Sequence, residues 1–212
     1  MASPVQVSAL WMSEFDAERP ISAEAAEIAA LLERAVTGDA AAFEQIVMRT
    51  ERRVLALASR LLGSMDDAQD AAQEVFIRAF KYLHRFDARK PIEPWLVGIT
   101  VNVCRTIARK RQQYARFFLG AAPREEEFAE TESSTDPHAD LASREQRRAL
   151  RTVLANLPEK ERTALVLRDL EGLSTAEVAG ILGSSEATVR AQISSARVKI
   201  KKAFDRMKGG RP

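Results

Sequence analysis

The 212-residue sequence predicts an all-α fold made of two small helical domains joined by a flexible acidic linker. Apolar residues recur at every third or fourth position along most of the chain, the spacing of a buried helix face. Alternating β-branched and polar residues between Asn-Gly or Asp-Gly turns, the signal of hairpins, are absent from the sequence. We therefore expect a loose leader (1–21), a helical domain (22–118), a linker (119–140) and a second helical domain (141–208).

The first domain is expected to begin with two helices. Apolar spacing predicts a helix over 22–37, with Gly38 as its C-terminal stop. Asp39 suits the N-cap of a second helix, which continues to Leu62 before Gly63.

Two further helices complete the expected first domain. The third is capped by Ser64 or Asp66 and runs to about Arg85. Pro91 and Pro94 then punctuate a loop and start the fourth helix, which ends in a basic run. The residues of the fourth helix expected to face inward are Trp95, Leu96, Ile99, Val103 and Ile107.

Helical spacing resumes at Leu141, after the acidic and Ser/Thr/Pro-containing linker. Pro158 is expected to open a helix that continues through Leu170. Ser174 to Glu177 match a capping box and predict a short helix that ends at Gly183. The last helix carries a regular apolar stripe of Val189, Ile193, Ala196 and Ile200.

The two final helices have the pattern of a helix-turn-helix, with Ser184 or Ser185 as the cap of the second. Because the apolar stripe claims one side, polar residues should point outward. Arg can bond guanine and Gln adenine in bidentate fashion, and serines at a helix start suit a phosphate. The candidate DNA-contacting residues are Ser185, Thr188, Arg190, Gln192, Ser194, Ser195 and Arg197. A plain helical hairpin with a solvated face remains the alternative.

A second candidate interface joins the loop near Phe86 to the fourth helix. Aromatic side chains beside a basic track can hold unstacked bases while cations bind phosphates. Trp95 is expected in the core, because Leu96 and Ile99 share its side of the helix, whereas a core or a site role stays open for Phe86. The candidate residues are Phe86, Lys90, Asn102, Arg105 and Arg109.

A polar row is expected on one side of the third helix. Asp70, Gln73, Glu74 and Arg78 stand three and four positions apart, so their side chains share a face. Such a row is usually solvated surface, and the residues alone leave a protein-docking role open.

Charge is unevenly distributed although the formal net charge is only +2. The acidic stretch 121–140 lies between basic segments, which suits a protein that lays two surfaces on a polyanion. Ordinary solvated helix faces would give the same pattern.

The sequence contains few residues in patterns typical of catalytic or metal-binding sites. It lacks a Gly-rich phosphate loop and zinc-ligand spacing, and its two histidines, His84 and His138, stand far apart. We expect no catalytic residue, no metal site and no cofactor. The single cysteine, Cys104, is expected to be a packed thiol. The start, 1–19, lacks the features of a signal peptide and no apolar run could span a bilayer, so we expect a cytoplasmic protein without membrane insertion.

From about Ile28 to Met207 the chain resembles the extracytoplasmic-function group of the sigma-70 family. Asp70 to Phe80 resembles the family's polymerase-clamp-binding helix. Pro94 to Asn102 is similar to its promoter-melting segment. The residues that resemble its C-terminal helix-turn-helix are Leu157 to Arg162, Leu170 to Ser174 and Ala187 to Arg190.

The resemblance implies a sigma factor that binds core RNA polymerase and promoter DNA and that has an anti-sigma factor as a further partner. It places Asp70, Gln73 and Glu74, with Arg78 beside them, on the polymerase clamp. It implies that Asn102 accepts a flipped base of the minus-10 element, with Phe86 and the loop 87–90 close by. The helix 190–197 would read the minus-35 element.

Some residues depart from the family's pattern. Cys104, Arg105 and Thr106 stand where an acidic residue is common, and small or neutral residues replace larger or basic ones on the recognition helix, so promoter sequence cannot be transferred. Two other classes of protein make different demands. An autonomous helix-turn-helix regulator would need a ligand pocket and dimerisation, and a small hydrolase would need a nucleophile beside a base.

Overall fold

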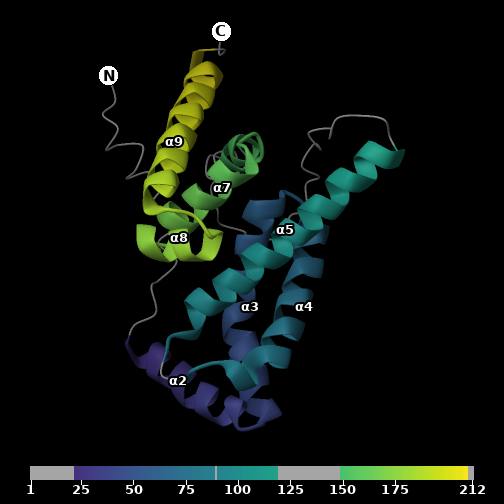
Figure 1. The fold of residues 1–212 in the computed structure, drawn as a ribbon, viewed down its shortest axis with the longest axis vertical. Coiled ribbons are helices and arrows are strands. Elements are labelled where there is room, and N and C mark those ends of the chain that lie inside the picture. Colours follow the sequence, from purple (N-terminus) through teal and green to yellow (C-terminus); the bar gives the residue numbers. More distant parts are fainter. Residues whose placement is uncertain (1–21, 89, 119–148, 210–212) are drawn as a thin grey trace, which may run out of the picture.

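The computed structural model describes residues 22–88, 90–118 and 149–209, and within these ranges every regular element is a helix. Figure 1 shows two helical groups lying against each other, one from each end of the chain. The predicted all-α, two-domain fold is therefore confirmed. The expected leader and the acidic linker lie outside the described residues.

Within the described residues, four α-helices build the N-terminal domain: α2 (Ser22–Val36), α3 (Ala40–Leu62), α4 (Met65–Tyr82) and α5 (Ile92–Phe118). Helix α3 packs against all three others, so it forms the centre of the domain. Leu57 on α3, Val75 on α4 and Val101 on α5 are almost fully buried, and each such side chain contributes about 1.5 to 3 kcal/mol of burial free energy.

The ends of these helices follow local chemistry. The side chain of Asp39 accepts a hydrogen bond from the Ala42 amide at 3.0 Å and caps α3. Of the two expected caps of α4, Ser64 is the one used, since its hydroxyl accepts from the Asp67 amide at 3.3 Å. Gly63 ends α3 with φ of 77°, a left-handed conformation open to glycine. The third helix is shorter than expected, because a 3-10 turn replaces it at Leu83–Arg85.

The C-terminal domain contains a helical segment at 149–155 and three labelled helices, α7 (Glu159–Leu165), α8 (Thr175–Leu182) and α9 (Glu186–Gly209). The predicted capping box is confirmed: the Glu177 amide donates to the Ser174 hydroxyl and the Ser174 amide donates to the Glu177 carboxylate. Leu167, Val178 and Val189 are fully buried between the helices.

One helix differs from the sequence expectation. The helix expected to run through Leu170 widens into a π-helical turn at Val166–Leu170. The Glu171 amide closes this turn by donating to the carbonyl of Val166, five residues back, at 3.0 Å. Gly172 follows with φ of 72° and turns the chain toward α8.

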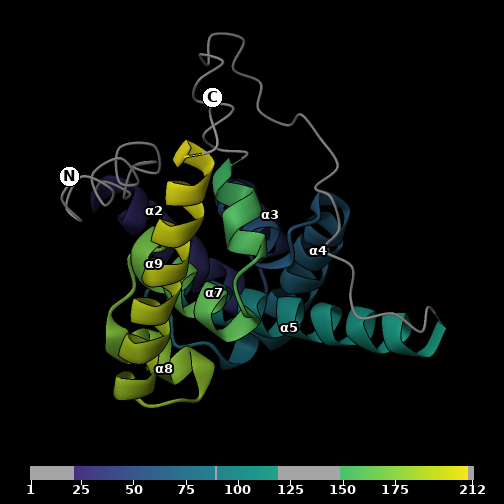
Figure 2. The same cartoon turned by 90° about the horizontal axis from the view of Figure 1, so that it is seen from above.

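The two domains contact each other through a defined set of helices. Helix α7 and the π-helical turn pack on α3, and α8 packs on α5. Figure 2 shows the far end of α5 extending beyond the helices of both domains. The contact therefore covers only part of α5.

Candidate nucleic-acid and polymerase interfaces

Helix α9 is the second helix of the helix-turn-helix, and Ser185 begins it. The Ser185 hydroxyl accepts a hydrogen bond from the Thr188 amide at 3.2 Å and lies 2.9 Å from the Thr188 hydroxyl. Both side chains are exposed. The start of α9 therefore presents hydroxyl groups beside its positive end, an arrangement that suits a phosphate.

The predicted apolar stripe of α9 is confirmed, because Val189, Ile193, Ala196 and Ile200 are all buried. On the opposite side, Arg190, Ser194 and Arg197 are exposed. The Arg190 guanidinium pairs with Glu186, one turn earlier, at 2.6 Å. A surface pair of this kind is weak enough to exchange for a DNA contact.

The prediction that Gln192 and Ser195 point outward is only partly correct. Both are half-buried, because they flank the apolar stripe on the helix surface. The Ser195 hydroxyl donates to a Glu161 carboxylate oxygen at 3.1 Å, so it is engaged inside the domain. The side-chain oxygen of Gln192 is buried and has no hydrogen-bond partner among the described residues.

The aromatic part of the second candidate interface lies where α5 begins. The rings of Phe86 and Trp95 are 4.8 Å apart at an angle of 42°, and both pack against the core while remaining partly exposed. Trp95 therefore only partly fills the core position expected for it. Asn102 and Arg109 follow Trp95 at seven-residue steps, so all three share one face of α5.

The cations of this interface have different surroundings. Lys90 is exposed, and its amide closes a turn with the Asp87 carbonyl at 2.9 Å. Arg109 is also exposed. Arg105 is different, because its guanidinium lies 3.8 Å from the carboxylate of Glu159 in the other domain. In this conformation Arg105 faces the C-terminal domain.

The polar row on α4 shares one face, as the spacing predicted. Asp70 and Gln73 are exposed, and the half-exposed Glu74 and Arg78 form an ion pair at 2.6 Å. Two apolar residues that the sequence did not single out, Ile77 and Phe80, extend this row. The available signal was their phase: both fall outside the buried stripe of Ala68, Ala71, Val75 and Ala79.

Ile77 and Phe80 are 56% and 57% exposed, which is unusual for side chains of this size. The Phe80 ring lies 5.1 Å from the ring of Phe43, which is buried and supports it from α3. The exposed face of α4 is therefore acidic at its start and apolar at its end. We call Asp70, Gln73, Glu74, Ile77 and Phe80 the α4 docking face.

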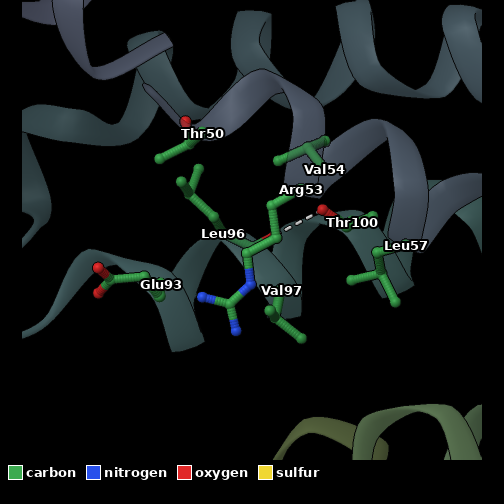
Figure 3. A pocket seen from close by; sticks show the side chains of 8 residues that line it. All are labelled: Thr50, Arg53, Val54, Leu57, Glu93, Leu96, Val97 and Thr100. Atoms are coloured by element: carbon green, nitrogen blue, oxygen red, sulfur yellow. Dashed lines mark hydrogen bonds between the residues drawn. The ribbon is translucent and has the colours of Figure 1, made fainter. Parts of the chain in front are cut away.

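Sites for small ligands are poor in the described ranges. A cavity of about 20 Å³ between α3 and α5 is lined by Thr50, Arg53, Leu96 and neighbours, and Figure 3 shows these side chains. It has room for about one water molecule, whereas ligand pockets span about 300 Å³ or more. Among the described residues there is no cluster of three or more metal-ligating side chains and no helix long and apolar enough to cross a membrane.

Cys104 is a packed thiol, as expected. It is 3% exposed, and burial raises the pKa of its thiol to about 12. At neutral pH the reactive thiolate form is therefore scarce.

Comparison with known families matches both domains. Residues 46–114 match the family described as Sigma-70 region 2, and residues 147–200 match Sigma-70, region 4. The RNA polymerase sigma-H factor of Pseudomonas aeruginosa is 33% identical in a match 184 residues long, and this match covers 82% of this chain and 92% of the relative. The ECF RNA polymerase sigma-E factor of Escherichia coli K12 is 33% identical in a match 181 residues long, which covers 80% of this chain and 90% of the relative.

A solved structure has the same fold. It is the sigma factor RpoE of Bartonella quintana in complex with the anti-sigma factor NepR, with a TM-score of 0.63 at 20% identity. The match covers 77% of this chain and 96% of that chain.

Proposed function

The chain belongs to the sigma-70 family of RNA polymerase sigma factors, in its extracytoplasmic-function group, and from that premise we propose how its residues share the work of initiation. The protein directs promoter-specific transcription initiation as a subunit of RNA polymerase. We assign residues 22–118 to region 2, residues 119–140 to the linker and residues 141–208 to region 4.

The C-terminal domain reads the minus-35 element with α9. The observation that supports this proposal most strongly is the capped helix-turn-helix. Its second helix buries its apolar side and exposes Arg190, Ser194 and Arg197. Ser185 and Thr188 bind a backbone phosphate at the helix start. Gln192 contributes at most through its amide nitrogen, and Ser195 acts through packing, because of their half-buried positions.

The N-terminal domain captures the opened minus-10 strand on α5. Asn102 bonds the edge of a flipped base, the Phe86–Trp95 pair offers a partly exposed aromatic surface, and Lys90, Arg105 and Arg109 bind phosphates. Arg105 becomes available for this only when it leaves Glu159 of the other domain.

The α4 docking face binds the clamp of core polymerase. Its acidic start supplies charge steering, and its exposed apolar end supplies an anchor that binding would bury; these are two components of a stable protein interface. The Bartonella quintana factor was solved with an anti-sigma factor, and we propose that an anti-sigma factor also binds this chain. Because its other partners are polymerase and promoter DNA, it acts in the cytoplasm.

The test of this function is run-off transcription. Core polymerase, purified protein and a library of genomic fragments should together yield discrete start sites that neither protein yields alone. Alignment of the mapped starts should show two upstream elements. If the protein were an autonomous regulator, the result would differ. The purified chain would bind specific duplexes tightly without polymerase, and it would not change the start sites that the polymerase uses.

A further inference from the structure

A carboxylate of the C-terminal domain is buried against two arginines of the N-terminal domain. The side chain of Glu171 is 3% exposed. One of its oxygens lies 3.0 Å from Nε of Arg53 and the other lies 3.0 Å from Nη1 of Arg60. A buried charge without partners is strongly unfavourable, so the burial of Glu171 depends on these arginines.

Local structure brings the three groups together. Arg53 and Arg60 are seven residues apart on α3, two turns along one face. Glu171 stands directly after the π-helical turn, which directs it toward α3. Figure 3 shows the Arg53 side chain extending from α3 past Leu96 and Val97 of α5. Burial lowers the pKa of Arg60, while the nearby Glu171 carboxylate favours its charged form.

A second contact lies along α5. Arg105 faces Glu159 at 3.8 Å, and a small cavity beside this pair is lined by Cys104 from one domain and by Arg162 and Thr163 from the other. The C-terminal domain thus covers the part of α5 that carries Arg105, one of the proposed minus-10 residues, and lies over the chain's single cysteine.

This packed arrangement cannot reach both promoter elements. The names of the elements place them about 25 base pairs apart, roughly 85 Å at about 3.4 Å per base pair. A compact chain of about 200 residues has a radius of gyration of about 16 Å. The 30 residues between 118 and 149 could span at most about 100 Å when extended, so the covalent connection permits separation.

We propose that Glu171, Arg53 and Arg60 form an intramolecular latch that keeps the free factor closed and that must open before both domains can engage a promoter. This inference rests on the proposed function, because only a protein that places its domains on two separated elements has to open. Core polymerase binds the open form, so the latch lowers the apparent affinity for polymerase by the fraction of molecules that are open.

Cys104 reports the opening in solution. In the closed form a thiol reagent reaches it slowly, and departure of the C-terminal domain removes one wall of its cavity. Glu171→Gln keeps the size of the side chain but removes the charge that both arginines pair with. We expect alkylation of Cys104 in the full-length variant to be faster by about 5- to 150-fold, the factor by which typical coupling free energies shift an equilibrium.

Two further variants make the measurement specific. The double variant Arg53→Gln/Arg60→Gln breaks the same contact from the other domain and should accelerate alkylation to a similar degree. Arg34→Gln is the control, because Arg34 pairs with Asp39 at 2.6 Å within the N-terminal domain and its loss should leave the rate unchanged. Small-angle scattering should show a larger radius of gyration for the two latch variants only.

Polymerase binding separates this proposal from a merely structural contact. Latch variants should bind core polymerase several-fold more tightly, in proportion to their gain in the open form, with unchanged run-off yield at saturating polymerase. Weaker binding or wild-type thiol protection in both latch variants overturns the proposal. If Glu171→Gln loses its helical circular dichroism, the double arginine variant decides. Absence of promoter-specific run-off from every variant, with the thiol pattern as expected, refutes the proposed function and leaves the latch itself standing.

Discussion

The guanidinium of Arg197 on α9 is held by the carboxylate of Asp169 through two hydrogen bonds, 2.7 and 3.0 Å long. Asp169 belongs to the π-helical turn, so α9, the proposed recognition helix, is bonded to a residue 28 positions earlier. The hydrogen bonds to Asp169 raise the pKa of Arg197 and fix the direction of its guanidinium. A fixed arginine selects among DNA positions better than a freely rotating one.

Asp169→Asn should therefore lower the discrimination between promoter and other DNA and raise the affinity for DNA of any sequence. Loss of the carboxylate frees Arg197 to contact any nearby phosphate, and one more phosphate contact steepens the log–log salt dependence of binding by about 0.9. Binding of holoenzyme to a promoter and to a scrambled duplex, across a salt series, measures both quantities. Asp205→Asn is the control, because it removes a carboxylate that is exposed on α9 itself and that, within the described part of the chain, forms no hydrogen bond or ion pair with Arg197. Unchanged discrimination in Asp169→Asn would contradict a positioning role.

The half-buried side of α9 predicts a contrast between Arg190 and Ser195. Arg190→Ala should weaken recognition of the minus-35 element by about 1 to 3 kcal/mol, because an exposed arginine can bond a base edge. Ser195→Ala should leave recognition nearly intact but cost about 0.5 to 1.5 kcal/mol of unfolding free energy, since its bond to Glu161 is lost. Footprinting and denaturant unfolding separate the two effects. The reverse order of effects would show that the face of α9 is wrongly assigned.

The α4 docking face predicts separate contributions from charge and from apolar area. Asp70→Lys/Glu74→Lys should impair capture of core polymerase, chiefly through a slower association rate, without loss of helical circular dichroism. Ile77→Ala should instead accelerate dissociation, because it removes an apolar anchor. Surface-bound core polymerase gives both rate constants. Met48→Ala is the matched control, since Met48 is 66% exposed on α3 and lies outside this face.

Asn102 predicts a separation of promoter binding from promoter opening. Asn102→Ala removes an amide from an exposed position, so the fold, holoenzyme assembly and duplex binding should persist. Strand capture should fail, because a flipped base costs a few kcal/mol that the lost bonds no longer offset. Permanganate reactivity of unpaired thymines should fall, and a template with a pre-melted bubble should partly restore transcription. Normal opening of an intact duplex by the variant would exclude Asn102 from melting.

The capping box of α8 predicts a pH-dependent term in stability. Hydrogen bonds from Ser174 lower the pKa of the Glu177 carboxyl in the folded protein. A lowered pKa means that this carboxylate stabilises the fold above its unfolded pKa and that the contribution disappears as pH falls through the folded pKa. Ser174→Ala should cost about 0.5 to 2 kcal/mol at neutral pH and less in acid. Urea unfolding at neutral and at acidic pH gives the comparison, and an equal cost at both would contradict it.

Local chemistry explains why much of the fold was predictable. Asp39, Gly63 and the Ser174–Glu177 box mark helix ends through interactions within a few residues, and the stripe of α9 records its buried side. The π-helical turn and the ion pairs of Glu171 were not predictable. The ion pairs join residues more than 100 positions apart, which no local pattern encodes.

The candidate interfaces were only partly predictable for the same reason. Spacing places Asp70, Gln73, Glu74 and Arg78 on one face, and the same spacing extends that face to Ile77 and Phe80. Spacing does not show that the other helices leave these two apolar side chains exposed. Apolar periodicity also divides the surface of a helix into only two classes, a buried side and an exposed side. Gln192 and Ser195 lie at the boundary between them, and for Ser195 the contact with Glu161 decides the orientation.

The π-helical turn at Val166–Leu170 makes the direction of α9, the helix proposed to read the minus-35 element, sensitive to the number of residues in the turn. A π-helical turn accommodates one more residue than an α-helical turn, and successive residues of an α-helix are rotated by about 100° about its axis. Deletion of a single residue here would let the segment rewind as ordinary α-helix. The rewound segment would turn Glu171, α8 and α9 to a new azimuth relative to α7. Loss of a single codon would therefore give a C-terminal domain that no longer fits against α3. Small insertions or deletions at this turn can change the direction of both α8 and α9.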